Sequence, residues 1–207
     1  MNYDEIKTLA LSYSDRSDTE VTDRMDNFIK IVESRINRFL MTMDMTTRAF
    51  VLTVEDQQYY RLPADFNGLR DIEVKSTIEG RSKLTHSYLN PEQMNAQYSG
   101  VEQGGEAFYT IIADQIQVWP TAVDDMILEI VYYKKVPNLN AVDTENWISL
   151  DNPDCYTFGL MTEISAFTKD VDAFKLWDAR FKESLGEIDL RDEKNKWSGT
   201  PLQTRVG

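Results

Sequence analysis

The 207-residue chain is poor in the residues that build metal and redox sites, with one cysteine, Cys155, and one histidine, His86. A single cysteine excludes an intrachain disulfide, which fits a reducing compartment. One histidine and one cysteine cannot supply the usual ligands of a structural zinc site. We therefore expect no metal site, with Cys155 as a small core residue and His86 as a surface or half-buried polar residue.

Nucleotide-binding and nucleophile motifs are also absent. Neither GxGxxG nor GxxxxGK[ST] occurs, and the pair Gly104-Gly105 precedes no predicted helix start that would cradle a phosphate. No serine or cysteine stands in a glycine-flanked nucleophile elbow. These absences predict no catalytic residue and no cofactor, so the protein is expected not to be an enzyme.

No apolar run is long enough to span a bilayer, and the first five residues are polar and acidic rather than a signal-peptide core. We expect synthesis in the cytoplasm and no membrane partner. The charge is strongly unbalanced, with 35 acidic and 22 basic residues and a net charge of −13. Simple solubility accounts for such a surface, and so does a need to avoid sticking to nearby DNA.

One enzymatic alternative stays open, a carboxylate-dependent hydrolase whose site lies on the β-rich middle of the chain. It rests on the acidic loops around Glu102 and Asp124, the latter followed directly by Asp125. Acid–base catalysis needs two carboxylates in different environments, and neighbours in a polar turn do not provide them. Asp124-Asp125 is more typical of a hairpin turn.

Helical periodicity marks both ends of the chain. Residues 3–11 predict a short helix, and apolar residues three and four apart predict a long one over about 18–41, with a capping box formed by Ser17 and Glu20. Glu33 is placed on its exposed face. Near the other end, Pro153 suits the first position of a helix capped by Asn152, and a second helix follows residues 169–170.

The middle of the chain has strand composition and short connections, which predict antiparallel pairing. Ala113-Asp114 is expected to form a two-residue hairpin, and Asn90 to cap a short helix that Pro91 opens. The expected strands are 49–54, 72–76, 107–112, 115–119 and 126–135.

These elements predict an α+β fold in which N- and C-terminal helices form a bundle and an antiparallel β domain is inserted between them. The expected domains are a helical bundle, an inserted β domain and a flexible C-terminal docking tail, at residues 1–46 with 146–194, 47–145 and 195–207 respectively.

A turn joins the helical region to the β region. Pro63 fixes its own φ, and Asp65 is expected to fold its carboxylate onto the backbone two residues on. Phe66 follows, and Arg70 lies at the start of the strand. We interpret Pro63, Asp65, Phe66 and Arg70 as structural rather than catalytic.

This turn belongs to an ordered series of short motifs that runs through most of the chain. In their order and spacing they resemble the head-to-tail adaptor (connector) proteins of tailed bacteriophages, the group that includes tail tubular protein A. The motifs are Leu62-Pro63-x-Asp65-Phe66-x-x-Leu69-Arg70, Ala113-Asp114-x-Ile116-x-Val118-x-Pro120, Leu128-x-Ile130-x-Tyr132-Tyr133, Asn146-Trp147, Leu176-Trp177-x-x-Arg180-Phe181 and Trp197-Ser198-Gly199-x-Pro201-Leu202.

The resemblance implies a structural virion protein of the neck and tail, made in the host cytoplasm. It implies a homo-oligomeric ring, twelve-fold in the virion, that lies beneath the portal protein and joins the capsid to the tail nozzle or other tail proteins. Genome DNA would pass through the central channel without specific binding. The helices and the C-terminal segment, with Trp197, Pro201 and Leu202, would dock on the portal.

Overall fold

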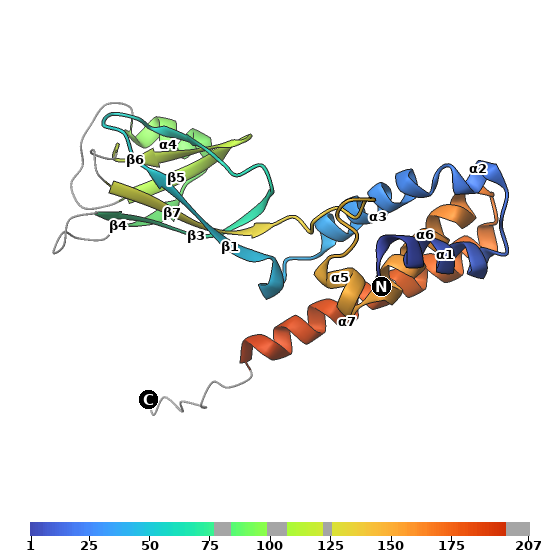
Figure 1. The fold of residues 1–207 in the computed structure, drawn as a ribbon. Coiled ribbons are helices and arrows are strands. Elements are labelled where there is room, and N and C mark those ends of the chain that lie inside the picture. The colour runs from blue at the N-terminus through green and yellow to red at the C-terminus, as the bar shows by residue number, and fades with distance from the viewer. Residues whose placement is uncertain (77–83, 99–106, 122–125, 198–207) are drawn as a thin grey trace, which may run out of the picture. The chain divides into compact units, whose positions relative to one another are not determined.

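The structure is a computed structural model that describes residues 1–76, 84–98, 107–121 and 126–197 (Figure 1). The chain forms two compact units, which we call the helical unit, Met1–Met43 with Val136–Gly207, and the β unit, Asp44–Lys135. Helices lie on both sides of the strand region along the chain, so the predicted α+β class is confirmed. The β unit ends at Lys135 rather than at the expected residue 145, because the segment that follows belongs to the helical unit.

The described part of the helical unit contains six α-helices. Gly159 lies where three of them meet, and a Cβ there would be 2.6 Å from Val32 Cγ1 and 3.2 Å from Phe181 Cε2. The lack of a side chain therefore lets the helices approach closely. The six are α1 (Tyr3–Ser14), α2 (Thr19–Thr22), α3 (Met25–Phe39), α5 (Trp147–Asp151), α6 (Pro153–Phe167) and α7 (Val171–Trp197).

The predicted single helix over 18–41 is wrong, because α2 ends at Thr22 and α3 begins at Met25. Val21 and Met25 are both fully buried, so the apolar spacing continues across the break and conceals it. The cap is also one residue later than predicted. Asp18, not Ser17, accepts the Val21 N–H on its carboxylate at 3.1 Å.

Helix α6 begins as predicted at Pro153, but Asn152 makes no side-chain cap. The capping residue of this region is Asn146, whose side-chain oxygen accepts the Ser149 N–H at 2.9 Å and starts the short, unpredicted helix α5. α7 continues to Trp197, past residue 194 where the bundle was expected to end.

Seven strands of the β unit are hydrogen-bonded in the order β1-β7-β3-β4-β5-β6-β2. Neighbours are antiparallel except β4 and β5, which run parallel. β4 is not among the predicted strands, and helix α4 (Pro91–Tyr98), which lies between β4 and β5 in sequence, provides the crossover that parallel pairing needs. The strands are β1 (Thr46–Leu52), β2 (Tyr59–Arg61), β3 (Phe66–Ser76), β4 (Leu84–Tyr88), β5 (Ala107–Ile112), β6 (Gln115–Trp119) and β7 (Met126–Lys134).

Two local predictions are confirmed. The hairpin between β5 and β6 closes with Ile112 opposite Gln115, and Ala113 takes a positive φ of 55° where glycine is more usual. Asn90 caps α4 by accepting the Gln93 N–H on its side chain at 2.7 Å.

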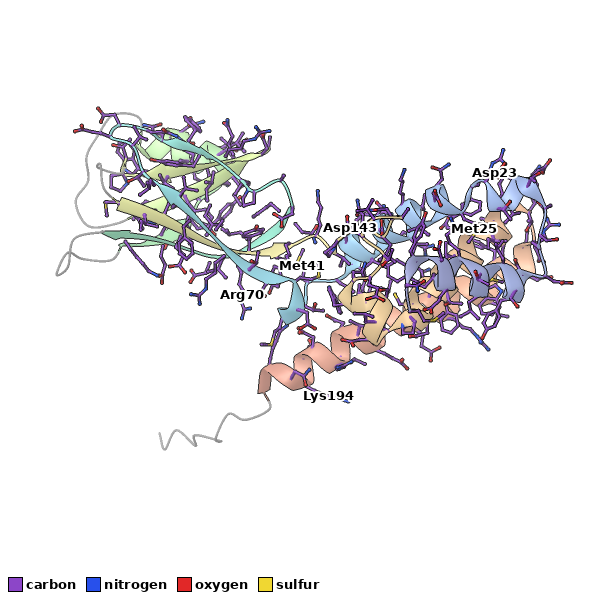
Figure 2. All side chains as sticks on the ribbon, in the orientation of Figure 1. Asp23, Met25, Met41, Arg70, Asp143 and Lys194 are labelled. Atoms are coloured by element: carbon purple, nitrogen blue, oxygen red, sulfur yellow. The ribbon has the colours of Figure 1, made fainter. Side chains whose placement is uncertain are left out.

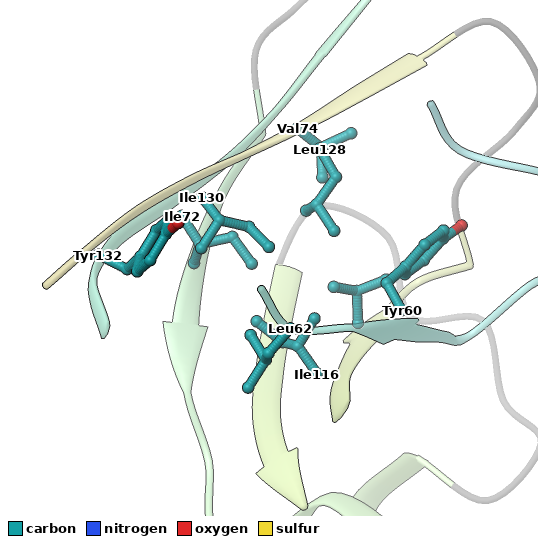
Figure 3. Close-up of a cluster of buried hydrophobic side chains, with 9 residues drawn as sticks. Tyr60, Leu62, Ile72, Val74, Ile116, Leu128, Ile130 and Tyr132 are labelled. Atoms are coloured by element: carbon teal, nitrogen blue, oxygen red, sulfur yellow. The ribbon is translucent and has the colours of Figure 1, made fainter. Parts of the chain in front are cut away.

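The core of the β unit forms where side chains of β2 and β6 point toward those of β3 and β7 (Figure 3). Alternation along each strand sends one face of the sheet inward. The buried residues are Tyr60, Leu62, Ile72, Val74, Ile116, Val118, Leu128, Ile130 and Tyr132.

Candidate functional site

The single thiol is an interior group. Cys155 is fully buried in α6, and burial raises its pKa to about 12. The thiolate that nucleophilic chemistry requires is therefore not formed near neutral pH. The prediction of a small core residue is confirmed.

His86 lies on β4, opposite Ala107 of β5, and is 8% exposed. It is more buried than the expected surface or half-buried position, and its strand, β4, is not among the predicted strands. Among the described residues, no group of three or more His, Cys, Asp or Glu side chains is arranged to hold a metal ion.

The acids of the hydrolase alternative, Glu102, Asp124 and Asp125, and the pair Gly104-Gly105 lie outside the described residues. The hydrolase alternative therefore stays a prediction, to be tested by changing Asp124 and Asp125 to Asn and measuring any hydrolysis. A further acidic pair, Asp170 and Asp172, lies at the start of α7. There the Asp170 carboxylate accepts the Ala173 N–H at 3.0 Å, which is the role of a helix cap.

The turn before β3 is held by hydrogen bonds to a distant strand. The Phe66 N–H donates to the Pro63 carbonyl at 3.0 Å, which closes the turn. Asp65 does not fold its carboxylate onto the nearby backbone as predicted. Its carboxylate accepts the Tyr132 hydroxyl at 2.9 Å, and its carbonyl accepts the Lys135 N–H at 2.7 Å. A tertiary partner thus replaces the local one.

The same contacts raise the pKa of Tyr132 and position its ring. Burial, with the Asp65 carboxylate beside the hydroxyl, raises the pKa of Tyr132 to about 12. Phe66 stacks on the Tyr132 ring at 5.8 Å between centroids. Arg70, labelled in Figure 2, donates to the Thr46 hydroxyl of β1 at 3.0 Å. The turn residues therefore tie together β1, β3 and β7.

A buried polar cluster, which we call the junction, holds the segment that returns from the β unit. The Glu33 carboxylate, 2% exposed, accepts the Leu139 N–H at 2.6 Å, and Asn37 Oδ1 accepts the Val136 N–H at 2.7 Å. The Tyr156 hydroxyl lies 3.4 Å from Glu33 and accepts from the Asn146 amide at 2.7 Å. Placing Glu33 on the exposed face of its helix was wrong, because a backbone group far along the chain is its partner.

Burial is the dominant cause of the unusual acidity at the junction. It raises the pKa of Glu33 from 4.5 to about 7, against the lowering effect of the Leu139 N–H and the Tyr156 hydroxyl. Burial, together with the nearby Glu33 charge, also raises the pKa of Tyr156 far above its ordinary value. The junction therefore favours a protonated carboxyl below neutral pH.

The outgoing connection is held in a similar way. The Met43 N–H donates to Asp192 Oδ1 of α7 at 2.7 Å, and Lys196 approaches the other carboxylate oxygen at 2.7 Å. Asp192 is 6% exposed. Both passages of the chain between the units are therefore hydrogen-bonded to side chains of the helical unit near their exits.

Aromatic side chains gather where α1 ends and α7 begins. Tyr13 and Phe158 contact the Trp177 ring at 6.4 and 5.8 Å between centroids, and the Arg180 guanidinium lies 5.3 Å from it. A cavity of about 520 Å³ opens here, lined in part by Tyr13, Asp15 and Trp177. Aromatic and arginine side chains of this kind are typical of protein interfaces.

The predicted docking residues divide at the end of α7. Trp197 is the last residue of that helix, while Pro201 and Leu202 lie outside the described residues. The docking role of these three residues therefore stays a prediction. Across the described part of the chain, no helix combines the length and apolarity needed to cross a bilayer.

Comparison with known protein families agrees with the motif series. The family model described as SU10 adaptor protein matches residues 1–205. The chain therefore belongs to the SU10 adaptor protein family, a family of phage head-to-tail adaptors, as the motif series predicts. No curated protein matches the chain.

Proposed function

We propose that this adaptor is a non-enzymatic structural protein of the virion neck that forms a homo-oligomeric ring, twelve-fold in the virion, beneath the portal. The ring joins the capsid to the tail nozzle or other tail proteins. The observation that carries this proposal is the family match over residues 1–205, nearly the whole chain. The motif series, which extends from Leu62 to Leu202, supports it.

The charge supports a channel through which DNA passes without specific binding. With a net charge of −13, the chain offers little counterion release on contact with phosphates. DNA would therefore slide rather than bind. A fluorescence anisotropy titration with duplex DNA at 50 mM salt should show no saturable binding.

The C-terminal segment is the proposed portal-docking element. Trp197 ends α7, and Pro201 and Leu202 follow within five residues. An apolar stretch of sequence after a long helix suits insertion into a partner groove. The helical unit would carry the segment to the portal, and the β unit would meet the tail.

The decisive experiment mixes the purified chain with the portal ring of the same phage and examines the complex by negative-stain microscopy. We expect a second ring on one face of the portal. Truncation before Trp197 should abolish portal binding, whereas deletion of residues 203–207 alone, which keeps Trp197, Pro201 and Leu202, should preserve it. Full portal binding by the chain truncated before Trp197 would refute docking through the C-terminal segment. Failure of the intact chain to join portal or virions would refute the whole proposal.

A further inference from the structure

Helix α3 has an outward face that is cationic, on a chain that is strongly acidic. The face is made of residues three and four positions apart, which lie side by side on a helix. Of the two acids of α3, Glu33 is buried, and Asp26 is exposed at the start of the helix, where it binds Lys7 at 2.8 Å. The exposed residues of the α3 face are Asn27, Lys30, Ile31, Ser34 and Arg38.

Helix α7 has an outward face of the opposite charge. This face lies across the helix from the buried Phe181 and Leu185, and its two leucines are 51% and 56% exposed. The exposed residues of the α7 face are Asp172, Leu176, Ala179, Glu183, Glu187 and Leu190.

Cations border the α7 face at both ends: Lys175 lies 3.9 Å from Asp172, and Arg191 and Lys194 are exposed four residues after Glu187 and Leu190 respectively. The cations beside its middle are engaged elsewhere. Lys182 binds Asp178 at 2.7 Å, and the Arg180 guanidinium lies over the Trp177 ring. The acidic side chains Glu183 and Glu187 are one helical turn apart and exposed. The middle of the α7 face, at Glu183 and Glu187, is therefore acidic and lies between Leu176 and Leu190. The α3 face is basic at Lys30 and Arg38, with Ile31 between them.

A groove lies beside the α3 face. It has a volume of about 470 Å³ and is lined by Arg35, Arg38, Phe39, Lys182 and Leu185. Phe39 is 53% exposed, so an apolar wall stands next to the Arg38 guanidinium. An exposed leucine one helical turn from a glutamate, as Leu190 is from Glu187, fits such a groove in both polarity and charge.

We propose that the α3 face of one copy packs against the α7 face of a neighbouring copy. The partner is a second copy because the same chain carries both complementary faces. The faces are different surfaces of one unit, so the contact is heterologous and can repeat around a closed ring. This inference rests on the proposed ring and names the surfaces that form it.

A cysteine trap tests the contact directly. One batch of full-length chain carries Ser34→Cys and a second carries Glu183→Cys, while Cys155 stays in place because it is buried. The batches are mixed with the portal ring and oxidised, and the linked peptides are identified by mass spectrometry. We expect a disulfide between the two batches at least about tenfold above that of either batch mixed with Thr8→Cys, an exposed position on α1. A yield equal to this control would overturn the proposal.

Charge reversal provides an independent test of the contact. Lys30→Glu with Arg38→Glu, or Glu183→Lys with Glu187→Lys, should each raise the concentration for half-assembly about tenfold, as measured by sedimentation velocity with portal present. All four changes in one chain should restore assembly to within about threefold of the natural chain, because the charges are again opposite. Circular dichroism checks that each variant is folded.

The outcomes distinguish a failure of this interface from a failure of the proposed ring. If the natural chain forms rings and the reversed variants form them equally well, this interface is wrong and the proposed function stands. Variants that still form rings but lose the portal would show that the α3 face meets the portal instead, and saturable DNA binding that depends on Lys30 and Arg38 would assign it to nucleic acid. Both results overturn the proposal. If the natural chain forms no ring with portal, the proposed function itself fails.

Discussion

The side-chain oxygen of Asn37 accepts the backbone N–H of Val136 at 2.7 Å, although the two residues are 99 positions apart. Val136 is the first residue of the chain after it returns from the β unit, and it is 2% exposed. This hydrogen bond therefore fixes the point at which the returning segment enters the helical unit.

Asn37→Ala should destabilise the chain by about 1–3 kcal/mol, because the buried Val136 N–H loses its acceptor. Urea unfolding followed by circular dichroism measures the change. Asn27→Ala, at an exposed position of the same helix, is the matched control and should stay within about 0.5 kcal/mol of the natural chain. Equal effects at the two positions would show that the Asn37 contact does not stabilise the fold.

Glu33 should make stability fall as the pH rises from about 4.5 to about 7. Burial raises its pKa to about 7, so the folded chain keeps a proton in this window that the unfolded chain has lost. The stabilising contribution is full below the unfolded pKa of 4.5, falls by about 3 kcal/mol, and is lost above the folded pKa. Glu33→Gln keeps an oxygen for the Leu139 N–H but has no such proton.

Urea unfolding of Glu33→Gln and the natural chain at pH 5, 6, 7 and 8 checks this expectation. The stability of the variant relative to the natural chain should increase from pH 5 to pH 7 and then level off. Glu187→Gln, at an exposed position of α7, serves as the control for removing one charge. A difference independent of pH would contradict the assigned role of Glu33.

Gly159 and Gly186 form a matched pair for testing helix packing. Gly159→Ala should destabilise the chain by about 1–3 kcal/mol, because the new methyl group would overlap Val32, 2.6 Å away. Gly186→Ala should stabilise it by up to about 1 kcal/mol, since nothing lies within 4 Å of its added Cβ and alanine favours the helix. Thermal unfolding of both variants measures the contrast, and a stabilised Gly159 variant would disprove the close approach.

Tyr132→Phe should destabilise the chain by about 1 kcal/mol, since it removes the hydroxyl bonded to Asp65 but keeps the ring that stacks on Phe66. Tyr133→Phe, the neighbouring residue on the other face of β7, is the control and should have a smaller effect. Urea unfolding followed by tryptophan fluorescence reports the difference. A larger loss in the control would show that the Asp65 contact is not the stabilising one.

Periodicity in the sequence predicts most helices and strands, because apolar spacing directly reflects which face is buried. It cannot detect the break between α2 and α3, since Val21 and Met25 are buried on the same stripe. It also cannot predict that β4 pairs with β5, because that pairing depends on a crossover rather than on either strand's own pattern.

Side-chain partners far apart in sequence are the other part that local patterns miss. Glu33 has the spacing of a solvated residue, yet the Leu139 N–H, 106 positions away, makes its burial tolerable. Asp65 likewise exchanges a local turn contact for Tyr132. The structural turn at Pro63 could be predicted because proline acts through its own ring, whereas the junction depends on which segments the complete fold brings together.

The double crossing of the chain has a mechanical consequence. Met43 and Val136, the residues at the two crossings, are both anchored by side chains, those of Asp192 and Asn37. Tension applied to the β unit would be shared by two covalent tethers loaded in parallel. Neither connecting segment could lengthen into the helical unit until its anchoring hydrogen bond, to Asp192 or to Asn37, had broken.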